Sequence, residues 1–508
     1  MVHQYKNNGF NIILDVDSGA VHVTDDIVYD IIPLFDGRDK TQVKNLMFLK
    51  DGVRDVLKEN ADGDKKPEND FLIDLDLPKH VEKILSSYKK EDIEEAIDEI
   101  AELIEGGQLY AKDIYERSIT NFKKRKTVVK ALCLHIAHDC NLGCKYCFAE
   151  EGEYHGRRAL MSFDVGKKAL DFLIENSGSR RNLEVDFFGG EPTMNWKVVK
   201  QLVEYGRSRE KEANKNFRFT LTTNGTLLND EIMDFCNKEM ANVVLSLDGR
   251  KEVNDRMRPF RGSGKSSYDV IVPKFREFAK RRGDLSYYIR GTFTYHNLDF
   301  SNDVLHYADL GFDNMSMEPV VSPPTEDYAI KEEDVPIILE EYDKLAKEYI
   351  KRSKEGKGFT FFHFMIDLEQ GPCVYKRLSG CGSGTEYLAV TPWGDLYPCH
   401  QFVGNEEFKL GTVDTGIENT DLVDEFKCCN VYAKPKCREC FAKYYCSGGC
   451  AANSYNFHGT ITDAYDIGCE MQRKRIECAI MIKAALAGES DYKKNNSVDA
   501  EVLAQAVR

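Results

Sequence analysis

The chain has 508 residues, too many for one simple core, so its length predicts two to four domains. Hydrophobic residues make up 42% and charged residues 30%, the balance of a soluble globular protein, and no apolar run approaches the ~18 residues that span a bilayer. The formal net charge of −16 argues against a general nucleic-acid binder, because phosphate contacts need a basic surface.

The first quarter of the chain predicts a small α+β unit over residues 1–115. Residues 4–24 predict two short strands around the turn "DVDSG", and the polar stretch 57–70 predicts a loop or a disordered insert. The amphipathic helix in "KKEDIEEAIDEIAELIEGG" should end at its paired glycines, and Leu109 and Tyr110 should begin a closing strand. The opening residues lack a basic segment followed by an apolar one, so we see no secretory signal and expect a cytoplasmic protein.

From residue 129 the pattern changes to apolar strands alternating with amphipathic helices. We expect six strands, in "VKALCLHIAH", "LEVDFFGG", "FRFTLTTNG", "ANVVLSLDG", "LSYYIRGTFT" and "NMSMEPV". Strand–helix repeats of this kind imply an α/β fold with a parallel sheet and right-handed crossovers, either an open sheet or an incomplete barrel. Polar residues and glycines cluster where the strands end, which is where such sheets place their sites.

The C-terminal part of the chain is poor in regular patterns. Residues 331–370 contain a long helix and form a helical bridge, and residues 371–485 are loop-rich with short hairpins such as "YLAVTPWGDLYPC". Such a segment has too little core to hold itself together, so we expect it to need covalent or metal staples. Residues 486–508 are polar and predict a loose tail.

The chain has sixteen cysteines, of which eleven fall between Cys373 and Cys478 and none precedes Cys133. A cytoplasmic compartment keeps thiols reduced, so metal ligation is a better expectation than disulfides. Cys133, Cys236 and Cys478 lie in strand or helix patterns and are expected to be buried packing thiols.

Cys140, Cys144 and Cys147 follow the first core strand at spacings of three and two intervening residues. Thiolates hold iron–sulfur clusters, and a cluster with three protein thiolates keeps one iron open for another ligand. The alternative is a zinc knuckle completed by His135 or His138, although structural zinc usually pairs a CxxC with a distant second pair. His135 fits the strand pattern and is expected to be a core or sheet residue.

With Tyr146 before its last cysteine, the CxxxCxxC stretch resembles the radical S-adenosylmethionine (SAM) superfamily, over about residues 130–320. In that family the open iron chelates the amino and carboxylate groups of SAM, and reduction cleaves SAM to methionine and a 5′-deoxyadenosyl radical. The resemblance implies a partial (β/α)6 barrel, with the three cysteines as the catalytic cluster. It also implies SAM contacts at Tyr146, Gly189, Gly190, Glu191, Pro192, Thr223, Asn224, Ser246, Asp248 and Arg290.

These implied contacts lie at successive strand ends. "FFGGEP" resembles the family's motif for the methionine amino group, and its two glycines let a backbone approach a ligand closely. The ends "TTNGT" and "LSLDG" correspond to positions that meet the carboxylate and ribose in related enzymes, and Arg290 is suited to pair with the carboxylate as a planar fork. Taken singly, a glycine pair or Asn-Gly after a strand is usually only a turn. Five such features in register favour the site.

The second group of cysteines resembles the SPASM domain, an appendage of radical SAM enzymes that holds two auxiliary four-iron clusters. The shared pattern is Cys-x12-Gly-x4-Cys, then Cys-x2-Cys-x5-Cys-x3-Cys, then a last cysteine. The resemblance implies that the first auxiliary cluster is held by Cys381, Cys399 and Cys450. It implies that the second is held by Cys437, Cys440, Cys446 and Cys469. A pair of zinc ribbons is the alternative, and either metal would staple this loop-rich segment.

Three further cysteines bear on the first auxiliary cluster. Cys373 lies outside the pattern but is the expected fourth ligand, and without it the first cluster keeps an open iron. Cys428 and Cys429 lie between the two ligand groups, where they are either structural or, if the usual pattern is disturbed, ligands. His400, beside Cys399, is a candidate general base by position alone, against the plainer interpretation of a supporting or surface histidine.

The N-terminal unit resembles a RiPP recognition element, which binds the leader of a ribosomally made precursor peptide as an added strand on a sheet edge. A dimerisation or capping module is the alternative. With "VHQYKNNGFNIILDVDSGAVHV" at its start, the whole layout resembles radical SAM/SPASM peptide maturases, closest to the thioether-forming maturases of SCIFF peptides, apart from extra length around 57–70. The expected domains are 1–115, 128–330, 331–370 and 371–485, followed by the tail.

The resemblance implies an oxygen-sensitive enzyme that links cysteine sulfur to an α-carbon in a cysteine-rich precursor peptide. It would use SAM and three [4Fe-4S] clusters, with a flavodoxin or ferredoxin as electron donor and neither nucleic acid nor membrane as partner. The nearest alternative is an anaerobic sulfatase-maturating enzyme that makes formylglycine. An alternative from another class is a non-catalytic iron–sulfur or zinc protein for electron transfer or scaffolding.

Overall fold

The computed structural model describes residues 1–49, 76–154, 156, 158–368 and 373–487. The polar insert expected at 57–70 and the tail from 488 lie outside these residues. Within them, no helix has the length and apolar character needed to cross a membrane.

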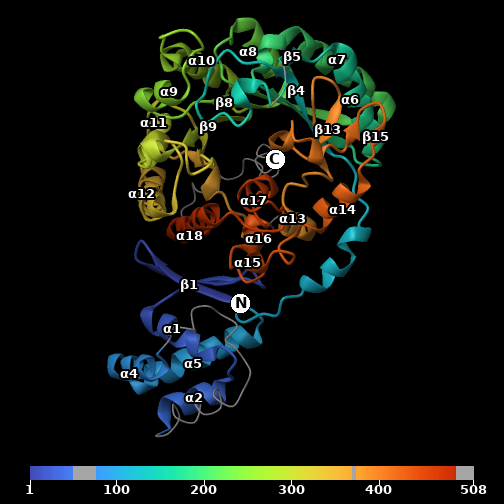
Figure 1. Cartoon of the computed structure of the whole chain (residues 1–508). Coiled ribbons are helices and arrows are strands. Elements are labelled where there is room, and N and C mark those ends of the chain that lie inside the picture. The colour runs from blue at the N-terminus through green and yellow to red at the C-terminus, as the bar shows by residue number, and fades with distance from the viewer. Residues whose placement is uncertain (50–75, 155, 157, 369–372, 488–508) are drawn as a thin grey trace.

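Parallel strands alternating with helices form the core, and the predicted α/β fold is confirmed (Figure 1). The six predicted strands are β4 (Ala131–His138), β6 (Asn182–Gly189), β7 (Asn216–Thr223), β8 (Met240–Ser246), β9 (Tyr287–Phe293) and β10 (Asn314–Pro319). They pair in parallel in the spatial order β4-β6-β7-β8-β9-β10, and β11 (Thr360–Phe361) follows β10 in the open sheet. Every residue of β4 is buried, as expected for a parallel strand covered on both faces.

The connecting helices cover the outside of this sheet (Figure 1). They are α6 (Phe163–Asn176), α7 (Trp196–Ala213), α8 (Asp230–Glu239), α9 (Lys251–Met257), α10 (Ser267–Arg282), α11 (Ser301–Asp309) and α12 (Val335–Lys354). α6 begins at a serine N-cap, because the Ser162 side chain accepts a hydrogen bond from the Val165 amide at 3.2 Å.

The C-terminal segment extends the core sheet instead of standing apart from it. β12 (Tyr387–Val390) pairs in parallel with β4, and β13 (Asp395–Tyr397), β14 (Gly411–Thr412) and β15 (Gly416–Ile417) continue antiparallel. The predicted hairpin is therefore present as β12–β13. The helices of this segment are α13 (Val374–Ser379), α14 (Thr420–Cys428), α15 (Pro435–Arg438), α16 (Lys443–Cys446), α17 (Ala451–His458) and α18 (Asp466–Leu486).

Short elements complete the chain. β5 (Ala159–Leu160) pairs with β4. The 3-10 turns are η1 (Ile32–Phe35), η3 (Glu116–Lys124), η4 (Glu150–Gly152), η5 (Pro192–Asn195), η6 (Tyr295–Asn297), η7 (Glu332–Asp334), η8 (Phe362–Phe364), η9 (His400–Phe402) and η10 (Glu406–Phe408).

The N-terminal unit is a three-stranded antiparallel sheet with helices on one face. Its strands are β1 (Val2–Asn7), β2 (Phe10–Asp15) and β3 (Val21–Thr24), and its helices are α1 (Asp26–Ile31), α2 (Lys40–Phe48), α4 (Leu77–Ser87) and α5 (Lys90–Glu105). One strand more than expected forms here. The closing strand predicted at Leu109 and Tyr110 is wrong: Tyr110 has a φ of 51°, which turns the chain, and its hydroxyl donates to the Ile32 carbonyl at 2.8 Å.

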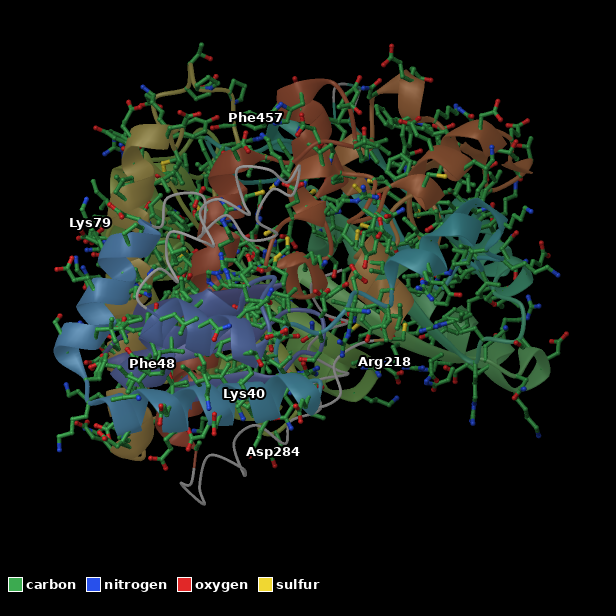
Figure 2. The ribbon with its side chains drawn as sticks, turned by 90° about the horizontal axis from the view of Figure 1, so that it is seen from below. Lys40, Phe48, Lys79, Arg218, Asp284 and Phe457 are labelled. Carbon is green, nitrogen blue, oxygen red and sulfur yellow. The ribbon has the colours of Figure 1, made fainter. Side chains whose placement is uncertain are left out.

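Successive side chains of β2 point to opposite faces of this sheet, and both faces are buried. Ile13 joins the apolar cluster of α1, α2, α4 and α5, whereas Ile12 and Leu14 join the main core of the molecule. The C-terminal segment therefore lies between the core and the N-terminal unit (Figure 1). Seen from below, the N-terminal unit carries Lys40 and Phe48 of α2 and Lys79 of α4 (Figure 2).

Candidate functional site

The three-cysteine loop leaves β4 and is tied to the segment after α9. The Gly143 amide donates to the Pro259 carbonyl at 2.8 Å, and the Lys145 amide donates to the Met257 carbonyl at 2.9 Å. These bonds hold the loop that contains Cys140, Cys144 and Cys147 in one conformation. Burial raises the pKa of Cys140 to about 11 and that of Cys144 to about 12, so ligation by their thiolates must release protons.

A pair of glycines at the end of β6 packs against the start of this loop. A Cβ on Gly189, whose φ is 115°, would lie 2.4 Å from the Ala137 carbonyl oxygen, and one on Gly190 would lie 2.1 Å from the Asp139 carbonyl oxygen. The Gly190 amide also donates to Ala137 at 2.7 Å. The close approach that requires glycine is thus made to the backbone just before Cys140.

Glu191 joins the ends of β6 and β7. Its buried carboxylate accepts from the Thr223 hydroxyl at 2.7 Å, from the Asn224 amide at 2.7 Å and from the Thr193 amide at 3.0 Å. Pro192 follows as the first residue of η5. Burial raises the pKa of Glu191, while these hydrogen bonds to its charged form oppose the rise.

Asn224 reaches from the end of β7 to the cysteine loop. Its side-chain amide nitrogen donates to Oδ1 of the Asn141 side chain at 2.9 Å and lies 3.6 Å from the Cys140 sulfur, which also accepts from the Leu142 backbone amide at 3.5 Å. Hydrogen bonds to a ligating sulfur are one means by which proteins tune an iron–sulfur cluster.

Asp248, after β8, lies in a buried group with Tyr146 and Arg258. The Tyr146 hydroxyl donates to one Asp248 oxygen at 2.6 Å, and the Thr292 amide donates to the other at 3.1 Å. Arg258 donates to the Tyr146 oxygen at 2.9 Å and lies 3.7 Å from Asp248. Burial raises the pKa of Asp248, and the charge of Arg258 opposes that rise. The sequence pattern contained no signal for Arg258.

Arg290 is exposed on β9, where it lies opposite Ser246 of β8 and Ser316 of β10. Its charge is among those that lower the pKa of Glu318, at the end of β10, to about 2 against the effect of burial. Glu318 also accepts from Arg475 of α18 at 3.4 Å. Sequence analysis missed Glu318 and Arg475, because only the fold brings α18 to the strand ends.

Two histidines, His135 and His138, are buried, and His363 and His400 are partly buried. His135 Nδ1 and His138 Nε2 are 3.0 Å apart, consistent with the expectation that His135 is a core residue. The centroid of the His400 ring lies 5.0 Å from that of Phe188, the residue before the glycine pair. Burial lowers the pKa of His138 and of His400 to about 4, and that of His363 to about 3.

The cysteines of the C-terminal segment fall into two groups. Burial raises the pKa of Cys399 and Cys450, and in each case the nearby thiol of Cys381 adds to the rise. The other group is Cys437, Cys440, Cys446 and Cys469; burial raises the pKa of Cys437, Cys446 and Cys469 to about 11, and neighbouring thiols of the group add to it. Among the described residues no three His, Cys, Asp or Glu side chains converge on one metal ion.

The cysteines outside these groups differ in how deeply they are buried. Cys133, Cys236 and Cys478 are buried at no more than 1% exposure, in agreement with packing thiols. Cys373 and Cys428 are exposed, whereas Cys429 is partly buried.

The family model of the Radical SAM superfamily matches residues 134–296, which run from β4 to η6 and contain the cysteine loop and the ends of β6, β7, β8 and β9. Residues 134–296 form a radical SAM domain.

Relatives of the chain extend beyond this radical SAM domain. An uncharacterized protein of Archaeoglobus fulgidus is 28% identical over 378 residues, covering 70% of this chain and 80% of its own length. A cysteine-type anaerobic sulfatase-maturating enzyme of Clostridium novyi is 24% identical, covering 70% of this chain and 96% of its own length. The solved structure of anSMEcpe with bound AdoMet has a TM-score of 0.61 at 19% identity, covering 75% of this chain and 98% of that chain.

The residues of the radical SAM domain suit the cofactors its family implies. Cys140, Cys144 and Cys147 lie in a loop held by backbone hydrogen bonds, and the Cys140 sulfur accepts amide hydrogen bonds. Three such thiols match the donor set of an iron–sulfur cluster with an open iron. Arg290, exposed on β9, and Ser246, at the end of β8, are charged and hydrogen-bonding groups of the kind that SAM would need, whereas both oxygens of the buried Asp248 are already occupied by Tyr146 and Thr292.

Proposed function

We propose that this chain is a radical SAM maturase that installs thioether cross-links between cysteine sulfur and an α-carbon in a cysteine-rich precursor peptide. The observation that carries the proposal is the combination of the radical SAM domain with two groups of thiols and an N-terminal sheet whose edge strand β3 pairs, among the described residues, only with β2. The bound cofactors would supply a hydrogen-abstracting radical and a route for the surplus electron.

The proposal assigns the ligand sets by position. Cys140, Cys144 and Cys147 would hold the catalytic cluster, Cys381, Cys399 and Cys450 the first auxiliary cluster, and Cys437, Cys440, Cys446 and Cys469 the second. The proposal assigns the SAM contacts to Tyr146 in that loop and to residues at or just after the strand ends, namely Gly189, Gly190, Glu191, Pro192, Thr223, Asn224, Ser246, Asp248 and Arg290. Glu191 and Asn224 also act on the protein itself, since they join β6 and β7 to that loop.

The leader of the precursor would bind along β3. The other edge strand, β1, is covered by α18: His3 lies 3.0 Å from the Glu477 carboxylate, and the Tyr5 hydroxyl donates to the Glu477 carbonyl at 2.9 Å. Within the described residues β3 pairs only with β2, and Val23 at its centre is 53% exposed. An extended peptide added there would gain main-chain hydrogen bonds. A structure of anSMEcpe with AdoMet and the Cp18Cys peptide has a TM-score of 0.57 and supports peptide chemistry on this fold.

The test is an anaerobic incubation of the reconstituted enzyme with SAM, a low-potential reductant and the precursor peptide. We expect about twelve irons per chain and a loss of about 2 Da from the peptide for each bond, because two hydrogens leave. The triple variant with Cys140, Cys144 and Cys147 changed to Ala should retain about eight irons and cleave no SAM. Deoxyadenosine formed without any change in peptide mass would contradict cross-linking.

A formylglycine-generating sulfatase maturase is the second candidate, favoured by the match to nearly the whole of the Clostridium novyi enzyme. The alignment with that enzyme covers 70% of this chain and leaves the remaining 30% without a counterpart. Loss of sulfur from a sulfatase peptide, together with no affinity for a leader peptide, would favour this second function.

A further inference from the structure

We propose that Tyr288 and His363 bind one main-chain amide of the substrate peptide beside the implied SAM contacts, and so hold the α-carbon that is to react. The inference rests on the proposed function, which supplies a peptide that reacts at an α-carbon. It adds two residues that lie outside both the cysteine motifs and the strand-end motifs.

The proposed site lies on the face of the core sheet that carries Arg290. Tyr288 precedes Arg290 by two residues in β9, so the two side chains share this face. Ile289, between them, points to the other face and joins the main apolar core. Arg290 lies opposite Ser316 of β10, and Glu318 is two residues further along the same strand. Tyr288 and Glu318 therefore border the position of an implied SAM contact.

His363 reaches this face from η8, directly after the edge strand β11. Its side chain is 5% exposed, and its Nε2 lies 3.5 Å from a Glu318 carboxylate oxygen without hydrogen-bonding to any residue that the structure describes. Burial and the charge of Arg475 lower the pKa of His363 to about 3, so the ring is neutral at neutral pH. The ring also hydrogen-bonds to the Met317 backbone, and this bond must use Nδ1. Nε2 is then a hydrogen-bond acceptor.

His363 and Glu318 are thus two neighbouring acceptors. Glu318, whose pKa is lowered to about 2, is ionised, and its other carboxylate oxygen accepts from Arg475 at 3.4 Å. An N–H group placed between Nε2 and the first oxygen would donate to both. An acceptor that is kept from water without a donor is destabilising, so this pair suits a ligand that carries an N–H.

Tyr288 offers the complementary group. It is 2% exposed, and among the described residues its hydroxyl has no hydrogen-bond partner. Burial raises the pKa of Tyr288, so the hydroxyl keeps its proton and remains a donor. The Phe362 ring lies 6.2 Å from the Tyr288 ring and 5.4 Å from the His363 ring, measured between centroids. The donor and the acceptor therefore belong to the two rings that flank Phe362.

A trans peptide unit has the matching pattern, because its N–H and C=O groups point in opposite directions from one flat group. Laid against Phe362, such a unit would donate to His363 and Glu318 and accept from Tyr288. Every residue of a peptide offers this amide, so the contact holds an α-carbon in place without selecting its side chain. Hydrogen abstraction at that carbon depends on such positioning.

The first experiment measures anaerobic binding to the reconstituted full chain, with SAM present and no reductant. Fluorescence anisotropy compares the labelled precursor peptide with its leader alone, and the difference in affinity is the contribution of the core peptide. We expect Tyr288→Phe and His363→Phe each to weaken precursor binding about tenfold and to leave leader binding unchanged. His363→Gln keeps an acceptor and should lose less.

Tyr287→Phe is the matched control for Tyr288→Phe. The Tyr287 hydroxyl accepts from the Asp313 amide at 3.1 Å, and its ring joins the main apolar core on the other face. This variant should bind the precursor as the wild type does. Unchanged iron content in all four variants shows that they fold.

The second experiment changes the same hydrogen bond from the substrate side. Mass spectrometry of the wild-type product locates the residue that accepts sulfur, and a precursor is made with an ester oxygen in place of that residue's N–H. We expect the wild type to bind this ester about tenfold more weakly than the amide. His363→Phe should bind both equally, because the substitution and the ester remove the same bond.

Precursor affinity that is unchanged in both Tyr288→Phe and His363→Phe would overturn the inference. So would additive losses from the ester and His363→Phe, or equal wild-type affinity for precursor and leader. Failure of the wild type to remove hydrogen from the precursor under reducing conditions would instead contradict the proposed function, so the two failures are distinguishable.

Discussion

Two buried residues of opposite charge lie near the end of β8 in the radical SAM domain. Asp248 and Arg258 are both buried, with Tyr146 between them, so each charge depends on the other for compensation. Removing one partner of a buried pair leaves the other charge without compensation, which costs more than the pair contributes.

Asp248→Asn keeps the shape of the side chain but removes its charge. We expect the free energy of unfolding to fall by about 3–5 kcal/mol, because Arg258 stays buried without an ionised partner. Urea denaturation of the variant measures this change. Asp269→Asn is the control, since Asp269 is 63% exposed beside Lys251, and its loss should cost under ~1 kcal/mol. Equal effects of the two substitutions would contradict the argument.

His363 gives the stability of the protein a dependence on pH. Burial lowers its pKa to about 3, so the folded protein keeps the ring neutral where an unfolded chain protonates it below about 6.5. The unfolded state therefore binds more protons between these values, and stability is lost as pH falls.

For His363→Gln we expect a shallower decline of stability with acidification. Between about pH 6.5 and 4.5 the wild type should lose roughly 2–3 kcal/mol that the variant does not lose. Urea midpoints measured across that range test it. Parallel curves for the two proteins would show that His363 contributes nothing to the slope.

At the scale of elements, the contact between the end of β6 and the cysteine loop depends on the absence of side chains. Gly190 approaches the Asp139 carbonyl so closely that any Cβ must displace the loop that carries Cys140.

Gly190→Ala should therefore displace the loop, lower stability by about 1–3 kcal/mol through overpacking, and lose about four irons. Iron analysis and thermal denaturation measure both effects. Gly264→Ala is the matched control, because a Cβ there meets nothing within 4 Å. Retention of all iron in Gly190→Ala would contradict the packing argument.

At the scale of the whole molecule, one buried lysine joins the N-terminal unit to the C-terminal segment. Lys443 of α16 is 4% exposed and lies 3.1 Å from Asp113 and 3.3 Å from Asp17. Lys443→Met removes this cation from both carboxylates, but Asp17 keeps the N-terminal ammonium at 2.7 Å, so the cost should be about 3 kcal/mol, the lower end for a broken buried pair.

Lys436→Met provides the comparison, since Lys436 and its partner Asp466 are both more than half exposed and the pair should contribute under ~1 kcal/mol. Limited proteolysis and urea denaturation of the two variants distinguish them. We expect early cleavage near residue 113 only in Lys443→Met, and similar digestion patterns would contradict this role for Lys443.

Sequence patterns predicted the secondary-structure elements whose formation depends mainly on neighbouring residues. The six core strands were recognisable because strands buried on both faces of a sheet are continuous apolar runs in the sequence. The closing strand at Leu109 and Tyr110 was predicted wrongly, because an apolar pair after glycines does not reveal a left-handed turn.

By itself, the sequence determined the α/β class, the order of the core strands along the chain and the cysteine spacings that point to cluster chemistry. Only the tertiary structure decided that β12 extends the core sheet at β4 and that Arg258, Glu318 and Arg475 reach the strand ends. Spacing along the chain predicts contacts within a loop or a turn. Pairings between residues hundreds of positions apart depend on how the buried surfaces fit together.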